Sequence, residues 1–334
     1  MKHARKLASL LLALVMVFAL TTTAFAEETT YSITINNSTE GHTYEAYQIF
    51  TGDLFIKENG DKVLSNIVWG SGVSEAGKTA LGDAAAKAET LKTEDDAKAF
   101  AKAVAPYLTT VAGSANTVTD GKYVISGLAA GYYLVKDQDG SLTGDSDSYT
   151  EYIIQVVGNV TATPKSDVPE VEKKVKDTNE TTGETTGWQD SADYDIGDSI
   201  PFQLKATLAD NVSSYTTYKV VFHDTLSKGL TYNNDAKVYI GGTETNGFTV
   251  TATVNADGTT TLTVSCDDVK ALGAGNSSVI TVEYTAKLNE NAVLGSAGNP
   301  NKVYLEYSNN PNKSESGENH ETGKTPEDTV IVFT

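Results

Sequence analysis

Short segments in which apolar and polar residues alternate are the feature that most limits the fold of this chain. In the second half they include residues 199–204, 218–222, 237–240 and 278–284, and turns rich in glycine, asparagine and aspartate separate them. A period of two is typical of strands with one buried face, and many such strands between turns indicate a β-sandwich. From about Val168 onward we therefore expect an immunoglobulin-like sandwich.

The first half predicts a second β-rich domain with a helical insertion. Residues 73–108 are rich in alanine, lysine and acidic residues, and apolar positions such as Ala85, Ala88 and Leu91 recur at helical spacing. Thr93, followed by three acidic residues, resembles a helix start. We expect two short amphipathic helices here, with strands before and after them.

The first 26 residues have the pattern of an export signal. Lys2, Arg5 and Lys6 form a positive segment, residues 7–20 are mostly apolar, and Ala24-Phe25-Ala26 is a small-x-small cleavage site. An uncleaved membrane anchor is the alternative. The predicted organisation is a signal peptide at 1–26, an N-terminal domain at 27–166 and an immunoglobulin-like domain at 167–334.

Charge and composition exclude several classes of function. Cleavage removes three positive charges, so the formal net charge falls from −19 to −22, and Arg5 is the sole arginine. Such a chain repels nucleic acid and lacks guanidinium groups for phosphate. The sequence has no Gly-x-Ser-x-Gly motif, phosphate loop or Cys–His pair, so we expect no turnover enzyme and no cofactor.

The histidines and the cysteine also point away from metal or redox chemistry. His42, His223 and His320 do not have metal-ligand spacing, and the aspartate-rich stretches near residues 137–147 are interpreted as solvated turns, so no metal site is predicted. Cys266 is the sole cysteine, which rules out an internal disulfide. A buried, inert thiol is favoured over a reactive one.

Three polar residues of the second half share phase with apolar strand positions. Lys173 alternates with Val171 and Val175, Asp224 is in phase with Phe222 and Leu226, and Asn301 is in phase with Val303, Leu305 and Tyr307. The pattern places an amine, a carboxyl and a carboxamide on inward faces. The alternative is that the amine of Lys173 reaches solvent and Asp224 caps a turn.

If these groups are buried together, they can react. Burial lowers the pKa of a lysine and raises that of an aspartate, so that the amine becomes a nucleophile and the neutral carboxyl can move protons. The expected product is an isopeptide bond between Lys173 and Asn301, formed with Asp224 as catalyst and with loss of ammonia.

The same segments resemble the sortase-assembled backbone pilins of Gram-positive bacteria. Residues 222–232 are similar to the family's segment around the catalytic aspartate, 301–311 to the segment with the bonding asparagine, and 173–175 to the segment with the bonding lysine. The resemblance extends to the N-terminal domain and implies tandem Cna-type sandwiches. Lys174 is the alternative bonding residue if the strand phase is shifted.

The resemblance also implies how copies would be joined. Residues 163–165, Thr-Pro-Lys, are similar to the family's pilin motif, although Thr163 stands where tyrosine is frequent. Lys165 would then attack an acyl group that a pilus-specific sortase holds, and would link the chain to other copies in a head-to-tail polymer. Minor pilins are further implied partners, and the implied location is a secreted, cell-wall-linked surface pilus.

Two family features are missing from the sequence. No C-terminal domain or sorting signal follows residue 334, and we expect the natural chain to continue. Residues 131–137 resemble the approach to an E-box but lack its glutamate, so no isopeptide bond is expected in the first domain. The alternative function is a minor pilin or surface adhesin that binds a host ligand through loops or the helical insertion.

Overall fold

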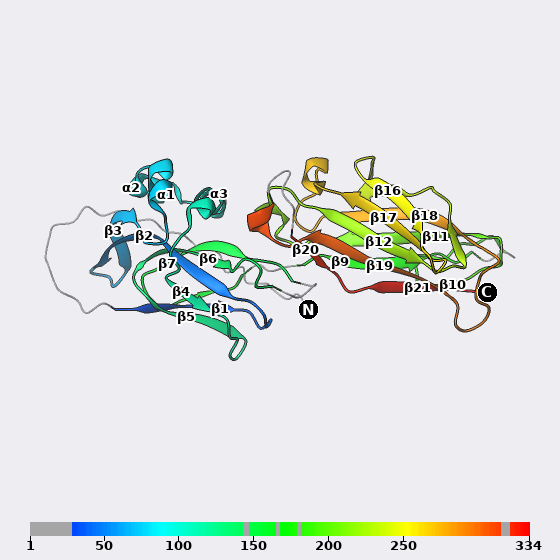
Figure 1. The fold of residues 1–334 in the computed structure, drawn as a ribbon, viewed down its shortest axis with the longest axis horizontal. Coiled ribbons are helices and arrows are strands. Elements are labelled where there is room, and N and C mark those ends of the chain that lie inside the picture. Colours follow the sequence, from blue (N-terminus) through cyan, green and yellow to red (C-terminus); the bar gives the residue numbers. More distant parts are fainter. Residues whose placement is uncertain (1–28, 143–146, 165–167, 179–181, 315–320) are drawn as a thin grey trace. The chain divides into compact units, whose positions relative to one another are not determined.

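A computed structural model describes residues 29–142, 147–164, 168–178, 182–314 and 321–334 (Figure 1). The described residues form two compact units, one built from those up to 142 and 149–164 and the other from those beginning at 168. The predicted signal peptide and the predicted boundary between residues 166 and 167 lie outside the described residues. Within the described part, no helix combines the length and apolar character needed to cross a bilayer.

The first unit contains two sheets. Its strands are β1 (Tyr31–Asn36), β2 (Tyr44–Ile56), β3 (Lys62–Trp69), β4 (Gly113–Ala115), β5 (Lys122–Leu128), β6 (Gly131–Asp137), β7 (Glu151–Val156) and β8 (Val160–Ala162). One sheet has the order β5-β1-β8, and the other has the order β3-β2-β6-β7 with β4 paired to β2. Strand β1 runs parallel to β8 and antiparallel to β5.

Strand β6 explains how the first unit holds two cores. Tyr133 and Val135 pack toward the three-stranded sheet, whereas Tyr132 and Leu134 pack toward the helices. A strand that is covered on both faces needs a continuous apolar run rather than an alternating one. The run from Tyr132 to Val135 meets that need, and all four side chains are buried.

Three helices cover the outer face of the five-stranded sheet, where two were predicted (Figure 1). They are α1 (Glu75–Leu81), α2 (Ala84–Thr90) and α3 (Glu94–Val104), followed by the 3-10 turn η1 (Ala105–Tyr107). The side chains of Ser74, Asp83 and Thr93 accept hydrogen bonds at the three N-termini, and Thr93 forms a capping box with Asp96. The predicted start at Thr93 is correct, and the predicted spacing of Ala85, Ala88 and Leu91 falls on α2 and its C-terminal cap, but α1 before Gly82 was not predicted.

The second unit is a sandwich of two sheets. Its strands are β9 (Glu170–Val175), β10 (Ser191–Asp193), β11 (Ser199–Thr207), β12 (Val220–Leu226), β13 (Leu230–Tyr232), β14 (Lys237–Ile240), β15 (Thr243–Thr245), β16 (Thr249–Val254), β17 (Thr260–Cys266), β18 (Val279–Leu288), β19 (Asn299–Ser308), β20 (Thr322–Lys324) and β21 (Asp328–Phe333), with 3-10 turns η2 (Val212–Ser214), η3 (Val269–Leu272) and η4 (Pro311–Lys313). The six-stranded sheet has the order β15-β14-β18-β11-β9, with β13 paired to β18. The seven-stranded sheet has the order β10-β21-β19-β12-β17-β16, with β20 paired to β19.

The inner faces of the two sheets form one core. Phe202, Leu204 and Val282 come from the six-stranded sheet, and Phe222 and Leu305 come from the seven-stranded sheet. Each side chain is fully buried, and polar residues alternate with them along the strands. The prediction of a mainly β chain with a helical insertion in the first domain is therefore confirmed.

Cys266 ends strand β17 on the inner face. Its side chain is 8% exposed and contributes to the sandwich core. Burial raises the pKa of the thiol, so the thiolate is disfavoured at neutral pH. The prediction of a buried thiol is correct, and the raised pKa is consistent with an unreactive one.

A close contact at Gly229 fixes the loop that precedes the site strand β19. A Cβ atom at this position would overlap the Asn299 Oδ1 atom and lie 2.8 Å from the Ala292 Cα atom. Asn299 has no room to move because its Oδ1 atom accepts from the Val293 amide at 2.8 Å and its Nδ2 atom donates to the carbonyls of Val293 and Val332.

We predict that Gly229→Ala destabilises the second unit by roughly 1–3 kcal/mol, because it overpacks a rigid contact. The matched control is Gly187→Ala, since a Cβ atom there meets nothing within 4 Å, and the expected change is within about 0.5 kcal/mol. Chemical denaturation of the full chain measures both. Equal effects of the two substitutions would contradict the proposed contact.

Candidate functional site

The site lies in the second unit, between the two sheets. Lys173 is on β9 and pairs with Leu204 of β11, so it belongs to the six-stranded sheet. Asp224 is on β12, between β17 and β19 in the middle of the other sheet, and Asn301 is on β19, opposite Leu226. All three side chains are 0% exposed. The structure brings together the three residues that strand phase selected.

Alternation along β9 separates the two candidate lysines. Lys173 points inward, whereas Lys174 points out and its Nζ atom lies 2.5 Å from the Asp190 Oδ1 atom at the surface. That exposed carboxylate raises the pKa of Lys174, which keeps its amine charged. The geometry therefore favours Lys173 over Lys174 as a nucleophile.

The buried amine and carboxyl are in direct contact. The Lys173 Nζ atom lies 2.5 Å from the Asp224 Oδ1 atom, and it also lies 5.4 Å and 5.5 Å from the ring centroids of Phe202 and Tyr284. Aromatic walls exclude water from the pair while they stabilise whatever positive charge remains on the amine.

Burial sets the proton affinities of this pair. Desolvation lowers the pKa of Lys173 and raises the pKa of Asp224, and in each case the attraction to the partner only partly opposes it. Both shifts favour the neutral amine and the neutral carboxyl over the ion pair, compared with the same residues in water. The transfer of one proton across the 2.5 Å contact interconverts the two forms.

Tyr284 is a member of the site that the sequence did not single out. It lies on β18, and its hydroxyl accepts from Asn301 Nδ2 at 2.7 Å and from Lys173 Nζ at 3.2 Å, and donates to Asp224 Oδ2. A signal was present, since Tyr284 is in phase with Ile280 and Val282, and a buried tyrosine hydroxyl needs a polar partner.

Asp328 is a second residue that the sequence did not select. It begins β21 in the opposite sheet, and its Oδ2 atom accepts from the backbone amide of Lys173 at 2.6 Å. Its charge also acts to raise the pKa of the Lys173 amine, against the effect of burial. This hydrogen bond joins β9, at Lys173, to β21 of the seven-stranded sheet.

The carboxamide of Asn301 differs from that of its neighbour Asn299. Asn299 uses both its oxygen and its nitrogen in hydrogen bonds to loop and strand backbone. In Asn301 the nitrogen donates to Tyr284, but the buried Oδ1 atom accepts no hydrogen bond from any described residue. The amide is therefore held by its nitrogen alone, and a donor that reached Oδ1 during attack at carbon would stabilise the charge that develops there.

The first unit has a different buried pair. His42 Nδ1 lies 2.7 Å from Asp137 Oδ1, both side chains are fully buried, and Thr150 donates its amide and hydroxyl to Asp137 Oδ2. Tyr44 stacks on the histidine with ring centroids 5.2 Å apart. Among the described residues of this unit, no lysine lies in the core.

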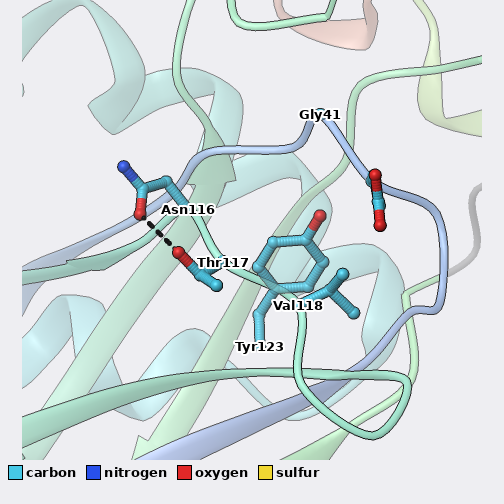
Figure 2. Close-up of a pocket in the computed structure, with 6 residues that line it drawn as sticks. Gly41, Asn116, Thr117, Val118 and Tyr123 are labelled. Carbon is cyan, nitrogen blue, oxygen red and sulfur yellow. Dashed lines mark hydrogen bonds between the residues drawn. The ribbon is translucent and has the colours of Figure 1, made fainter.

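A surface depression of the first unit is lined by loop residues and by one aromatic wall (Figure 2). Its lining residues are Glu40, Gly41, Asn116, Thr117, Val118 and Tyr123. The hydroxyl of Tyr123 donates to the carbonyl of Thr39 at 2.7 Å, and the hydroxyl of Thr117 donates to the side-chain oxygen of Asn116 at 3.2 Å. These local bonds involve the hydroxyls of Tyr123 and Thr117 and the side-chain oxygen of Asn116.

Lys165, the predicted point of attachment between copies, lies outside the described residues. The described chain ends at Pro164 before it and resumes at Val168 after it. The assignment of Lys165 therefore stays a prediction from the sequence.

Residues 196–311 match the family described as Gram-positive pilin backbone subunit 2, Cna-B-like domain. The match lies within the second unit. The matched residues contain Asp224, Tyr284 and Asn301, whereas Lys173 precedes them.

Relatives extend the similarity to both units. The trypsin-resistant surface T6 protein of Streptococcus pyogenes serotype M6 is 27% identical over 346 residues, which cover 93% of this chain and 59% of that protein. The solved T6 backbone pilin has a TM-score of 0.58 at 21% identity and covers 93% of this chain and 65% of its own. The full-length major pilin SpaD of Corynebacterium diphtheriae has a TM-score of 0.50 at 18% identity, with 92% and 67% covered.

These matches confirm the predicted resemblance to backbone pilins and the tandem Cna-type fold. At such identities the solved structures establish the shared fold alone. The chain spans 59% of the length of the curated relative and 65% of the T6 pilin structure.

The buried pair generates a prediction about stability that does not depend on any covalent bond. In a chain that carries Asn301→Ala, we expect Asp224→Leu to cost roughly 3–5 kcal/mol, because it leaves a buried amine without its partner. Adding Lys173→Met should recover most of that loss, since a well-packed apolar pair is about as stable as the ion pair.

The matched control is Lys174→Met in the same background, with an expected change of about 0–1 kcal/mol for an exposed pair. Chemical denaturation of each chain measures the differences. The pairing is refuted if the loss of unfolding free energy in the double variant, Asp224→Leu with Lys173→Met, equals the sum of the losses in the two single variants.

Proposed function

We propose that this chain is a shaft subunit of a covalent cell-surface pilus, stabilised by an internal Lys173–Asn301 isopeptide bond and polymerised by a sortase through Lys165. One observation carries the proposal: a lysine, an aspartate and an asparagine with no solvent exposure converge between the sheets of a pilin backbone domain. Burial of three such groups is costly unless they are paired or react.

The internal reaction begins with a proton transfer. The Lys173 ammonium gives one proton to Asp224 Oδ1 across their 2.5 Å contact, which leaves a neutral amine and a neutral carboxyl. The lone pair of Nζ then attacks the Asn301 Cγ atom, and the electrons of the carbonyl bond move to Oδ1. A second proton must leave Nζ, and one must reach Nδ2, before the bond to Nδ2 breaks and ammonia departs. The products are a secondary amide and ammonia.

The bond would join β9 to β19 across the core. It closes a loop that contains most of the second unit, so by analogy with a disulfide of similar span it would stabilise the fold by roughly 4–5 kcal/mol. An amide is not reduced by thiols. Such a link suits an exported chain whose single cysteine cannot form an internal disulfide.

The link between copies is proposed from the sequence and the family. A sortase would hold the next subunit as a thioester at a threonine carbonyl, and the Lys165 amine would attack that carbonyl while the sortase thiolate leaves. Pro164 and Pro169 favour an extended backbone around the lysine, which would make it accessible to an enzyme. Minor pilins and the cell wall are the further proposed partners.

We predict that the purified chain is lighter than its sequence by the mass of one ammonia. Lys173→Ala, Asn301→Ala and Asp224→Ala should each restore the full mass, because each removes a reacting or proton-carrying group. Lys174→Ala is the matched control and should keep the deficit, since its amine faces solvent. Intact mass spectrometry decides, and a full mass in the unsubstituted chain would rule out the internal bond.

We predict that Lys165→Ala abolishes the ladder of covalent polymers when the natural protein is expressed with its sortase. Lys176→Ala, which changes another lysine close to the predicted domain boundary, should leave the ladder intact. Denaturing gel electrophoresis of cell-wall extracts gives the measurement. A ladder that survives Lys165→Ala would favour the alternative function, a minor pilin or adhesin, or another attachment lysine.

A further inference from the structure

Among the described residues, the Tyr284 hydroxyl is the group that contacts both reacting nitrogens and the carboxyl. Its oxygen accepts from Lys173 Nζ at 3.2 Å and from Asn301 Nδ2 at 2.7 Å, and its proton is donated to Asp224 Oδ2. A phenol has one donor and two acceptor positions. The three contacts use all of them, so the hydroxyl is held in place by the reacting groups themselves.

The hydrogen bonds of the site give Asp224 no direct route by which to deliver a proton to the Asn301 Nδ2 atom. Asp224 contacts the nucleophilic nitrogen, but among the described residues the hydrogen bonds of the site connect Asp224 to the leaving nitrogen of Asn301 only by way of the Tyr284 oxygen. Loss of ammonia requires a proton on that nitrogen, because an amide anion is too basic to leave. The Tyr284 oxygen already touches this nitrogen as an acceptor, and its proton, which points to Asp224 Oδ2, can turn to the nitrogen once the tetrahedral intermediate gives that nitrogen a free lone pair.

We propose that Tyr284 is a catalytic residue of the bond-forming reaction, whose hydroxyl carries a proton from Lys173 Nζ to Asn301 Nδ2. The inference rests on the proposed isopeptide bond and adds a fourth residue to its mechanism.

The proton balance closes with this residue included. The first proton leaves the Lys173 ammonium for Asp224, and the neutral amine attacks Asn301. The tetrahedral intermediate then carries a positive Nζ with two hydrogens. The Tyr284 oxygen accepts one of these as its own proton moves to Nδ2, and the carbonyl reforms as ammonia leaves. Tyr284 ends as a neutral phenol, Asp224 ends protonated, and Nζ keeps one hydrogen as an amide.

The surroundings keep the hydroxyl suited to this task. The ring stacks on Phe202 with centroids 5.4 Å apart and meets the edge of Tyr232 at 5.7 Å, so packing of the ring adds to the hydrogen bonds that hold the hydroxyl. Burial and the nearby Asp224 raise the pKa of the phenol well above its ordinary value, so it stays protonated. A phenol that does not ionise can relay a proton in a concerted exchange without accumulating charge in the core.

The test is the rate of bond formation in Tyr284→Phe, which removes the hydroxyl and keeps the ring. The full chain is made by cell-free synthesis, stopped in acid at intervals, and its fraction lacking one ammonia is followed by intact mass. We expect the variant to be slower by roughly 100-fold or more, the usual contribution of a positioned acid–base group. The matched control is Tyr232→Phe, a tyrosine of the same cluster whose hydroxyl contacts the Ala236 amide, and it should react at the unsubstituted rate.

Two further measurements separate catalysis from folding. In the Asn301→Ala background, where no bond forms, Tyr284→Phe should still unfold cooperatively. If it does not fold, 3-fluorotyrosine at position 284 replaces it, because this group keeps the shape and changes the acidity of the hydroxyl.

The outcomes are distinct. A full mass in the unsubstituted chain overturns the internal bond and this inference with it. A deficit that appears at the same rate in the unsubstituted chain and in folded Tyr284→Phe overturns the role of Tyr284 alone, as does an unchanged rate with fluorotyrosine. Slow formation in Tyr284→Phe beside normal formation in Tyr232→Phe supports it.

Discussion

The contact between a buried amine and a buried carboxyl governs the architecture of the second unit. Neither Lys173 nor Asp224 has any solvent exposure, and an isolated charge in such a place would cost far more than a typical packing contact returns. The two groups tolerate the core because they lie 2.5 Å apart and because Tyr284 bonds to both. The two sheets must therefore keep β9 and β12 in one relative position.

The same requirement explains features that look unrelated to chemistry. Strand β9 is the last strand of its sheet, and Asp328 from the other sheet accepts from its backbone amide at Lys173. The Asp328 carboxylate accepts from a backbone N–H group that the edge strand β9 would otherwise leave unpaired. The same hydrogen bond holds Lys173 in position. On the other side, the bonds of Asn299 and the absence of a side chain at Gly229 hold the start of β19, two residues before Asn301.

The two units bury ionisable groups in different ways. In the first unit the pair is His42 and Asp137, and Thr150 satisfies the second carboxylate oxygen. In the second unit the pair includes a primary amine, beside a carboxamide whose oxygen accepts no hydrogen bond from the described residues. An imidazole–carboxylate pair is suited to fixing a core, whereas an amine that shares a tyrosine hydroxyl with a carboxamide lies near a group with which it can react. We expect covalent chemistry in the second unit for this reason.

Local pattern was sufficient to select the inward residues of single strands. Phase with apolar neighbours identified Lys173, Asp224 and Asn301 because side chains alternate strictly between faces, and the β-rich architecture followed from the same rule. Tyr284 is also in phase with apolar neighbours but was not singled out, and Asp328 and His42 were not selected either. Their importance comes from partners on other strands, and no local spacing reports those distances. Helix α1 was also missed, since the apolar spacing that predicted a helix here begins only at Ala85.

The sequence by itself determined the strand periodicity, the faces on which the polar residues lie, the acidic charge and the lack of disulfides, because each depends on residues close together in the chain. Only the tertiary structure decided that three inward faces converge at one point, and that a tyrosine joins them. It also separated Lys173 from Lys174, which strand phase had left open, by the contact of Lys174 with Asp190. Convergence depends on sheet pairing and on packing between sheets, which are set by contacts between residues far apart in sequence.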